Sequence, residues 1–204
     1  SLAAPLSLVG REFDAEPLVA RRRGEKFTYI DEGASLSLDV ALAGTHQVEN
    51  AALAIRATQT IGVGNRAIRS GLTHVRWPGR FDRRGRFILD GAHNPHGIHA
   101  LFAELSRRFP SRRFPIVFAA MRDKAIPEML GALAPAASHF HFVRVDRERG
   151  TSTLALAQHA RPLGVPTFRH ATIAAALAAT TGPTVVTGSL YLVGAALTLF
   201  NRRA

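Results

Sequence analysis

The sequence predicts an α/β protein whose larger part, from residue 87 onward, is a mainly parallel sheet with helices on both faces. Two observations lead to this fold class. Short apolar runs alternate regularly with longer helical segments, and no internal repeat or low-complexity tract interrupts the alternation. Strands that alternate with helices pair in parallel. The expected strands are 87–89, 115–119, 141–145, 167–169 and 184–187, and the expected helices are 95–108, 126–133, 153–161, 173–179 and 190–200.

The residues before this region show a different pattern. Residues 1–25 carry only a weak pattern, but 27–30 and 36–40 are typical of two short strands around a turn. Ala and Leu dominate from Ala51 onward, which predicts a helix with Thr45 as a possible N-cap. A shorter helix is expected to follow, over residues 65–72.

These patterns predict two structural units joined by a hinge. We expect a separate, incomplete unit over residues 1–76, a linker over 77–86 and the α/β unit over 87–204. Because the first unit lacks most of a sheet, apolar faces around Leu53 and Ile55 should be exposed or packed against a partner.

Composition limits the classes of protein that fit. The chain has 204 residues, of which 47% are hydrophobic, so it can bury a sizeable core. It has no cysteine, which excludes disulfides and cysteine-ligated zinc. The first residues lack the features of a signal peptide. The apolar run Leu190–Phe200 is too short to span a bilayer, so we expect a cytoplasmic protein without a membrane partner.

The formal charge of +11 comes almost entirely from arginine. Such a balance is compatible with nucleic acid, with an anionic small molecule, or with a solvated, arginine-preferring surface. The arginines are scattered in pairs along loops. Aromatic residues such as Phe87, Phe118 and Phe142 fall in core-like positions, whereas a nucleic-acid surface would expose them beside basic residues. We therefore expect no nucleic-acid partner, and keep a nucleic-acid-binding module as an alternative.

One stretch organises the candidate site. Arg80 lies on a Pro-Gly turn, the apolar run 87–89 ends in Asp90, and Pro95 is well placed to start a helix. A carboxylate at the end of a parallel strand can accept hydrogen bonds from ribose hydroxyls, and a nearby Arg can pair with phosphate. Asp90 could instead cap the following helix, and His93 could be a structural turn residue. The sequence contains no phosphate-binding P-loop motif of its own.

Three ordered motifs make the chain resemble a known family. They are Gly44–Ala52 (GTHQVENAA), Trp77–Phe81 (WPGRF) and Leu89–Pro95 (LDGAHNP). Together they resemble the folylpolyglutamate synthase / dihydrofolate synthase family of the Mur ligase superfamily. Further similar stretches are Ser7–Phe13, Met121–Lys124 and Thr187–Gly194.

The resemblance implies a reaction and a truncated chain. Members of the family begin with a P-loop ATPase domain that carries most magnesium ligands, so 1–76 would be the tail of that central domain. Residues 87–204 would be a Rossmann-like C-terminal domain. The implied substrates are ATP with Mg²⁺, L-glutamate, and a folate or dihydropteroate, joined through an acyl phosphate. The fragment alone is expected to be inactive, and a non-catalytic nucleotide-binding domain is the further alternative.

The resemblance also implies roles for individual residues. Asn50 matches the residue that contacts adenine, Arg80 the one that reaches the nucleotide phosphates, and Asp90 the ribose ligand. His93 matches a neighbouring nucleotide-site histidine, so that Arg80 and His93 are the candidate catalytic residues. Lys124 and Ser189 match residues that hold the incoming amino acid, and no metal ligand is expected in this part of the chain. The sequence departs from the family pattern at Ala125, where Asp is common.

Each of these residues also has a structural interpretation. Asn50 could pack or cap a helix, Arg80 could be one more surface arginine, and Lys124 could be a solvated charge. Ser189 could cap the last helix, which does not exclude a role in binding. His46 is interpreted as structural, at the start of its helix.

Overall fold

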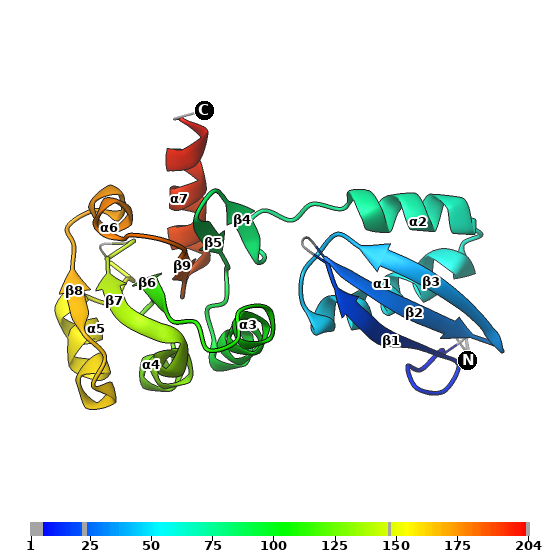
Figure 1. The fold of residues 1–204 in the computed structure, drawn as a ribbon, viewed down its shortest axis with the longest axis horizontal. Helices are drawn as coiled ribbons and strands as arrows, with labels where there is room; N and C mark the ends of the chain where they lie inside the picture. Colours follow the sequence, from blue (N-terminus) through cyan, green and yellow to red (C-terminus); the bar gives the residue numbers. More distant parts are fainter. Residues whose placement is uncertain (1–5, 22–23, 147, 203–204) are drawn as a thin grey trace. The chain divides into compact units, whose positions relative to one another are not determined.

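The computed structural model describes residues 6–21, 24–146 and 148–202. The chain divides into two compact units, Ser1–Trp77 (unit 1) and Pro78–Ala204 (unit 2), and each unit has its own sheet (Figure 1). Within the described ranges, every helix is too short or too polar to cross a membrane.

Unit 1 is an antiparallel three-stranded sheet with two helices. Its core contains Phe27, Tyr29, Val48 and Ile55. Because β2 alternates buried and partly exposed residues, one face of the sheet packs on the helices. The elements are β1 (Phe13–Ala20), β2 (Glu25–Asp31), β3 (Ala34–Val40), α1 (Thr45–Thr60) and α2 (Asn65–His74), and the strand order is β1-β2-β3.

Unit 1 differs from the sequence-based expectations in three places. The strand β1 was not predicted, because only Phe13 of its eight residues is buried and the apolar alternation is weak. Thr45 is the first residue of α1 and not its N-cap; that position is held by Gly44, whose φ is +117°. Leu53 is half exposed, as expected, but Ile55 is buried in the unit's own core.

Unit 2 is a six-stranded sheet covered by helices. All its strand pairs are parallel except the pairing of the short strand β4 with β5. The strands are β4 (Asp82–Arg84), β5 (Phe87–Leu89), β6 (Phe114–Phe118), β7 (Ala137–Phe142), β8 (Thr167–Arg169) and β9 (Thr184–Thr187), in the order β4-β5-β9-β6-β7-β8.

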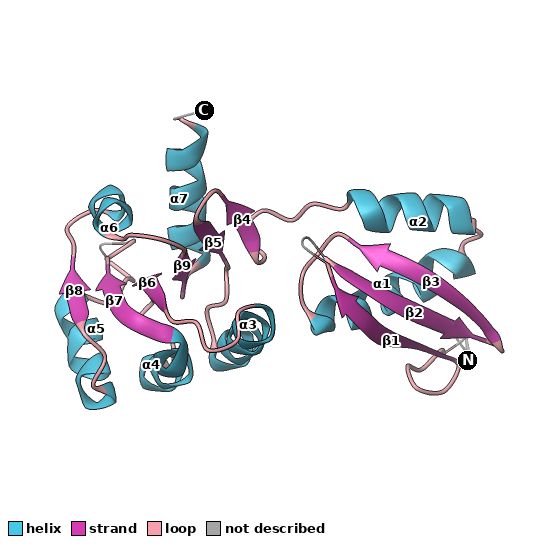
Figure 2. Cartoon of the chain, viewed as in Figure 1, coloured by secondary structure: helices cyan, strands magenta, loops and turns pink. Residues whose placement is uncertain are grey.

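The helices of unit 2 cover both faces of this sheet (Figure 2). On one face, Leu89, Val117 and Val186 pack with residues of α6 and α7. The intervening residues point to the opposite face, which α3, α4 and α5 cover. The α-helices are α3 (Pro95–Arg108), α4 (Ile126–Leu133), α5 (Thr153–Ala160), α6 (Ile173–Ala179) and α7 (Leu190–Asn201), and two short 3₁₀ turns are η1 (Ala134–Ala136) and η2 (Arg161–Leu163).

The predicted α/β fold class is confirmed, and two details differ. The strand expected at 141–145 is β7, which begins at Ala137, because His139 and His141 break the apolar run that would have marked it. Residues 82–84, expected to lie in a linker, form β4 and pair with β5. The expected helices 126–133 and 173–179 have the predicted bounds.

Candidate functional site

Four of the polar residues singled out in the sequence gather at one edge of the unit 2 sheet. Asp90 and His93 follow β5, Ser189 follows β9, and Lys124 follows β6. The strands β5, β9 and β6 are neighbours, so their carboxyl ends lie side by side. This is the edge at which open α/β sheets bind their ligands.

The carboxylate of Asp90 joins two loops at this edge. It accepts a hydrogen bond from the backbone N–H of Phe81 at 2.9 Å and another from the N–H of Ala92, also at 2.9 Å. The interpretation of Asp90 as the cap of α3 is wrong, because Asn94 is the N-cap and accepts the N–H of Gly97 at 2.8 Å. Hydrogen bonds of this kind to a carboxylate are roughly twice as strong as neutral ones.

Arg80 lies on the turn whose Phe81 N–H donates to the Asp90 carboxylate. The turn is tight: Gly79 has a φ of +77° and Phe81 a φ of +46°. A Cβ on Gly79 would lie 2.5 Å from the Val193 side chain, so only glycine fits there without a shift. The carbonyl of Gly79 accepts the N–H of Gly91 at 2.8 Å. The exposed Arg80 is therefore fixed to unit 2 through its backbone.

His93 lies partly exposed beside this turn, and its tautomer follows from its contact. Its Nδ1 is 2.9 Å from the carbonyl oxygen of Gly91. A carbonyl oxygen only accepts, so Nδ1 carries the proton and donates. In the neutral ring Nε2 is then an acceptor. The arrangement leaves His93 suited to accept a hydrogen bond at Nε2.

Ser189 is buried at the start of α7 and caps that helix. Its hydroxyl accepts the N–H of Tyr191 at 3.2 Å, which leaves the hydroxyl proton available to donate. Gly188, just before it, has a φ of +96° and lies so close to β6 that a Cβ would meet the Ala119 carbonyl oxygen at 2.5 Å. Its N–H donates to the Ala92 carbonyl at 2.9 Å. The loops after β5 and β9 are thus bonded to one another.

Lys124 lies in the loop after β6 and is half-exposed. Its Nζ is 3.0 Å from an Asp123 carboxylate oxygen, and this hydrogen bond is the main cause that lowers the pKa of Asp123. The loop is supported by the one that follows β7: the Arg122 N–H donates to the Arg149 carbonyl at 3.0 Å and the Thr151 N–H to the Ala120 carbonyl at 2.9 Å. Lys124 therefore lies on a loop that backbone hydrogen bonds hold in place.

Thr151 is a residue of this edge that the sequence reasoning missed. It is buried, and in the part of the chain that the structure describes its hydroxyl has no hydrogen-bond partner. Nothing in its sequence context marks it, because threonine before a helix is usually a cap and the cap of α5 is Ser152.

Asn50 lies in unit 1, exposed on α1. Its Nδ2 donates to Gln47 Oε1 at 3.3 Å, and Gln47 Nε2 is 2.8 Å from His46 Nε2. Gln47 itself is buried. These three side chains form a short hydrogen-bonded series at the start of α1, which orients the Asn50 amide. Asn50 thus belongs to unit 1, whereas the other candidate residues belong to unit 2.

Over residues 6–21, 24–146 and 148–202 there is no group of three or more His, Cys, Asp or Glu side chains arranged to hold a metal ion.

Comparison with known proteins places this edge in a family. Residues 79–197, which include the Arg80 turn, Asp90, His93, Lys124 and Ser189, match the family described as "Mur ligase, glutamate ligase domain". The chain belongs to the Mur ligase family. Its similarity within that family is to folylpolyglutamate and dihydrofolate synthases, in sequence and in structure.

Two curated relatives illustrate the sequence similarity. The chain is 34% identical over 149 residues to the dihydrofolate synthase/folylpolyglutamate synthase of Bacillus subtilis, covering 68% of this chain and 34% of that protein. It is 30% identical over 201 residues to the folylpolyglutamate synthase of Lacticaseibacillus casei, covering 91% and 46%. The chain thus spans less than half the length of these relatives.

Two solved structures show the same fold. The folylpolyglutamate synthase of Thermotoga maritima superposes with a TM-score of 0.85 at 28% identity, over 96% of this chain and 48% of that one. The Mycobacterium tuberculosis folylpolyglutamate synthase, complexed with ADP, also gives 0.85 at 28% identity, over 95% and 49%.

Proposed function

We propose that this chain is the C-terminal portion of an ATP-dependent ligase that adds L-glutamate to dihydropteroate or to a (poly)glutamyl folate. One observation supports the proposal most. Hydrogen bonds join Asp90, the Arg80 turn and the loop after β9 at the carboxyl edge of the sheet, in a region that matches the glutamate ligase domain. The ADP complex of the M. tuberculosis relative supports a nucleotide as one ligand.

We propose that the nucleotide is bound by Asp90, His93, Arg80 and Asn50. A carboxylate has about four lone-pair positions, so a carboxylate that binds backbone N–H groups, as Asp90 does, is also a suitable acceptor for ribose hydroxyls. His93 Nε2 can accept one more hydrogen bond. The Asn50 amide both donates and accepts, as an adenine edge requires. The guanidinium of Arg80 is shaped to pair with phosphate oxygens.

In the proposed reaction a carboxylate oxygen of the pterin substrate attacks the γ-phosphorus of ATP, the bond to ADP breaks, and an acyl phosphate forms. Arg80 offsets the charge that develops on the phosphates. Mg²⁺ would accompany ATP, with most of its ligands in the P-loop domain. The amino group of glutamate then attacks the acyl carbon, phosphate leaves, and the ammonium loses two protons in giving the amide. Lys124 and Ser189 hold the incoming amino acid.

The 204-residue chain on its own should not complete this reaction, because it carries no loop that cradles a triphosphate. Folate- and glutamate-dependent release of phosphate from the purified chain would contradict this part of the proposal. The whole-protein activity is tested in a protein that carries this chain together with a P-loop domain.

The decisive experiment there is steady-state kinetics on wild type, Arg80→Ala and Arg80→Lys, with Arg169→Ala as a control arginine on the exposed strand β8. We expect Arg80→Ala to lower turnover more than it raises the Michaelis constant for ATP, since its contact is realised in the reactive state. Arg80→Lys should restore little of the lost turnover, because lysine lacks the planar guanidinium group that pairs with two phosphate oxygens. A change in the Michaelis constant alone would make Arg80 a simple binding contact.

A further inference from the structure

Unit 2 carries a cluster of arginines outside the candidate site. They come from three separate segments: β4, the end of α3, and the loop that leads into β6. Two acidic side chains lie among them, and both are paired. Asp82 bonds Arg84 at 3.1 Å, and Glu104 bonds Arg107 at 2.9 Å and also Arg108. The remaining arginines are Arg83, Arg112 and Arg113.

These three arginines are exposed, and no ion pair involves them in the parts of the chain that the structure describes. We call them, with Phe102 and Phe109, the basic surface. Three positive charges thus lie on one surface without a carboxylate paired to them, which favours an anionic partner.

Aromatic rings hold two of these arginines in place. The guanidinium of Arg83 lies 5.9 Å from the Phe109 ring centre, and that of Arg112 lies 5.7 Å from the Phe114 ring centre. The two rings meet edge to face at 5.5 Å. Arg83 and Arg112 are therefore placed at the two ends of one aromatic pair. Such cation–π contacts order the guanidinium groups before any ligand arrives.

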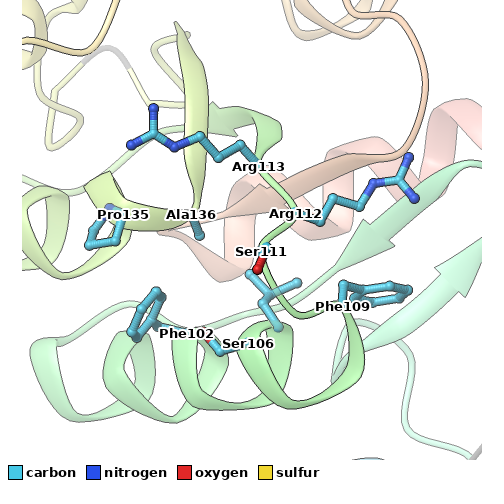
Figure 3. Close-up of a pocket in the computed structure, with 9 residues that line it drawn as sticks. Phe102, Ser106, Phe109, Ser111, Arg112, Arg113, Pro135 and Ala136 are labelled. Atoms are coloured by element: carbon cyan, nitrogen blue, oxygen red, sulfur yellow. The ribbon is translucent and has the colours of Figure 1, made fainter.

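A pocket opens beside these arginines. It has a volume of about 280 Å³, and its lining combines aromatic rings, serine hydroxyls and arginine stems, from Phe102, Ser106, Phe109, Ser111, Arg112 and Arg113 among others (Figure 3). In Figure 3 the Phe102 and Phe109 rings lie at opposite sides of the view, and Ser111 lies between them. This lining offers a stacking surface with hydrogen-bonding groups nearby.

The two arginines of the loop point away from one another. In Figure 3 the side chains of Arg112 and Arg113 leave the loop in opposite directions. One small anion cannot contact both guanidinium groups in that arrangement. An extended chain of anions can, because successive charges pass each arginine in turn.

We propose that the basic surface binds a segment of single-stranded nucleic acid, with phosphates on Arg83, Arg112 and Arg113 and a base against Phe102. An acidic peptide without aromatic residues, such as polyglutamate, would use the arginines but has no aromatic ring for the pocket, so the lining favours a nucleic acid. The proposal departs from the expectation of no nucleic-acid partner. That expectation rested on Phe87, Phe118 and Phe142, whereas Phe102 and Phe109 are partly exposed.

The test is fluorescence anisotropy of the whole chain with a labelled, roughly 12-nucleotide oligothymidylate, titrated at several salt concentrations. The Arg112→Ser/Arg113→Ser double variant is compared with Arg161→Ser/Arg169→Ser, which removes the same charge from exposed positions after α5 and on β8. We expect at least tenfold weaker binding from the first pair only. The slope of log K against log salt should fall by about 1.4, the value for two phosphate contacts to a single strand.

A second variant, Phe102→Leu, tests the base pocket without changing the charge. We expect about fivefold or greater weakening, the lower end of the effect of losing one stacked base. Thermal unfolding of each variant shows that the fold is intact. Equal weakening by both arginine pairs would reduce the effect to diffuse charge and overturn the proposal.

Two competition outcomes would overturn it as well. The first is displacement of the oligonucleotide by polyglutamate as effectively as by unlabelled oligothymidylate, which would identify a general polyanion surface. The second is displacement by saturating ADP, which would place the strand at the carboxyl edge. Because the basic surface and the candidate site consist of different residues, failure here leaves the proposed ligase function standing, and failure of the kinetics at Arg80 leaves this proposal standing.

Discussion

The two units present their candidate residues in different ways. In unit 2, the candidates follow the ends of parallel strands, and the loops that carry them are bonded to one another through Asp90, Gly91 and Gly188. In unit 1, Asn50 lies on the exposed side of a helix, and Gln47 is the side chain that orients it. The site residues of unit 2 therefore take part in the hydrogen bonds that stabilise the fold. Asn50, by contrast, lies on the surface of a helix whose stability we expect not to depend on it.

This difference predicts how substitutions behave. A change in the loops of unit 2 should alter stability and binding together, since the same atoms serve both. A change at Asn50 should alter binding alone. The units should also differ in their response to pH, because burial lowers the pKa of His141 in unit 2 and raises the pKa of Tyr29 in unit 1.

The largest effect is expected from Gly188→Ala. At a φ of +96° an alanine is strained, and its Cβ would lie 2.5 Å from both the Ala119 carbonyl oxygen and the Phe118 ring. Backbone strain and overpacking together should lower the free energy of unfolding by roughly 4 kcal/mol. Urea unfolding followed by circular dichroism measures this. The matched control is Gly164→Ala, whose φ is +66° but whose Cβ would meet nothing within 4 Å, and which should cost about 1 kcal/mol.

If the two alanine variants lose the same stability, the close approach of the β6 and β9 loops contributes nothing, and the description of the unit 2 edge as tightly bonded is wrong.

The second effect is loss of unit 2 stability in acid. His141 is buried, its Nδ1 is 2.8 Å from His170 Nε2, and burial, with the nearby charges of His139 and His170, lowers the pKa of His141 to about 4. In the unfolded chain that pKa is about 6.5. A lowered pKa means that the unfolded state binds the proton first. The stabilisation is full above pH 6.5 and is lost as the pH falls toward 4.

That loss should amount to about 3 kcal/mol, measured as the free energy of unfolding between pH 7 and pH 4. His141→Gln should flatten this dependence, whereas His159→Gln, an exposed histidine on α5, should leave it as in wild type. An identical acid profile for wild type and His141→Gln would assign the acid sensitivity to other groups.

The third effect is loss of unit 1 stability in alkali. The Tyr29 hydroxyl lies 3.0 Å from Gln59 Oε1 and 3.2 Å from Asp31 Oδ2, and burial followed by the Asp31 charge raises the pKa of Tyr29 to about 12. The unfolded value is about 10. The stabilisation is therefore complete below pH 10 and is lost as the pH rises toward 12, by roughly 2–3 kcal/mol.

Tyr29→Phe should remove this dependence, and Tyr191→Phe, at an exposed position of α7, should not. Tyrosinate absorbance should correspondingly titrate in two steps, one of them near pH 12 and absent in Tyr29→Phe. A single step near pH 10 in wild type would show that Tyr29 is not held neutral by the unit 1 core.

The sequence predicted best those elements in which apolar, buried residues form a clear pattern. The strand β6, buried at all five positions, and the apolar helix α4 were predicted within one residue. The strand β1 was missed because seven of its eight residues are not buried, and β4 because it has three polar residues, Asp82, Arg83 and Arg84. Neither strand carries the apolar pattern that marks an element in a sequence; tertiary pairing forms both.

The candidate site was predicted as a set of residues but not as a set of contacts. The strand-end position of Asp90 follows from the pattern. Its bond to Ala92 is local, but its bond to Phe81 spans nine residues, and the fit of Gly188 against Ala119 joins segments far apart in the sequence. No local pattern encodes the last two contacts. Thr151 was missed for the same reason. The roles of Asn50, Arg80, Asp90, His93, Lys124 and Ser189 stay predictions.

The smallest effect, and the most direct test of the comparison, is Asn50→Ala against Asp90→Ala. Asp90→Ala removes charge-assisted bonds, so ADP affinity should fall by roughly 1.5–3 kcal/mol, and stability should fall too because two backbone N–H groups lose their acceptor. Asn50→Ala removes neutral bonds from an exposed position, so ADP affinity should fall by only about 1 kcal/mol while the free energy of unfolding changes by less than about 0.5 kcal/mol. Isothermal titration and urea unfolding measure the two quantities.

Glu49→Ala, an exposed neighbour on the same helix, controls for nonspecific effects on α1 and should change neither quantity. Because an amide that reads adenine distinguishes it from guanine, Asn50→Ala should also reduce the preference for ADP over GDP, whereas Asp90→Ala should weaken both nucleotides equally through the ribose. If Asn50→Ala lowers stability as much as Asp90→Ala does and leaves the base preference unchanged, Asn50 is a structural residue of α1, and the contrast between a site built into unit 2 and a contact added to unit 1 does not hold.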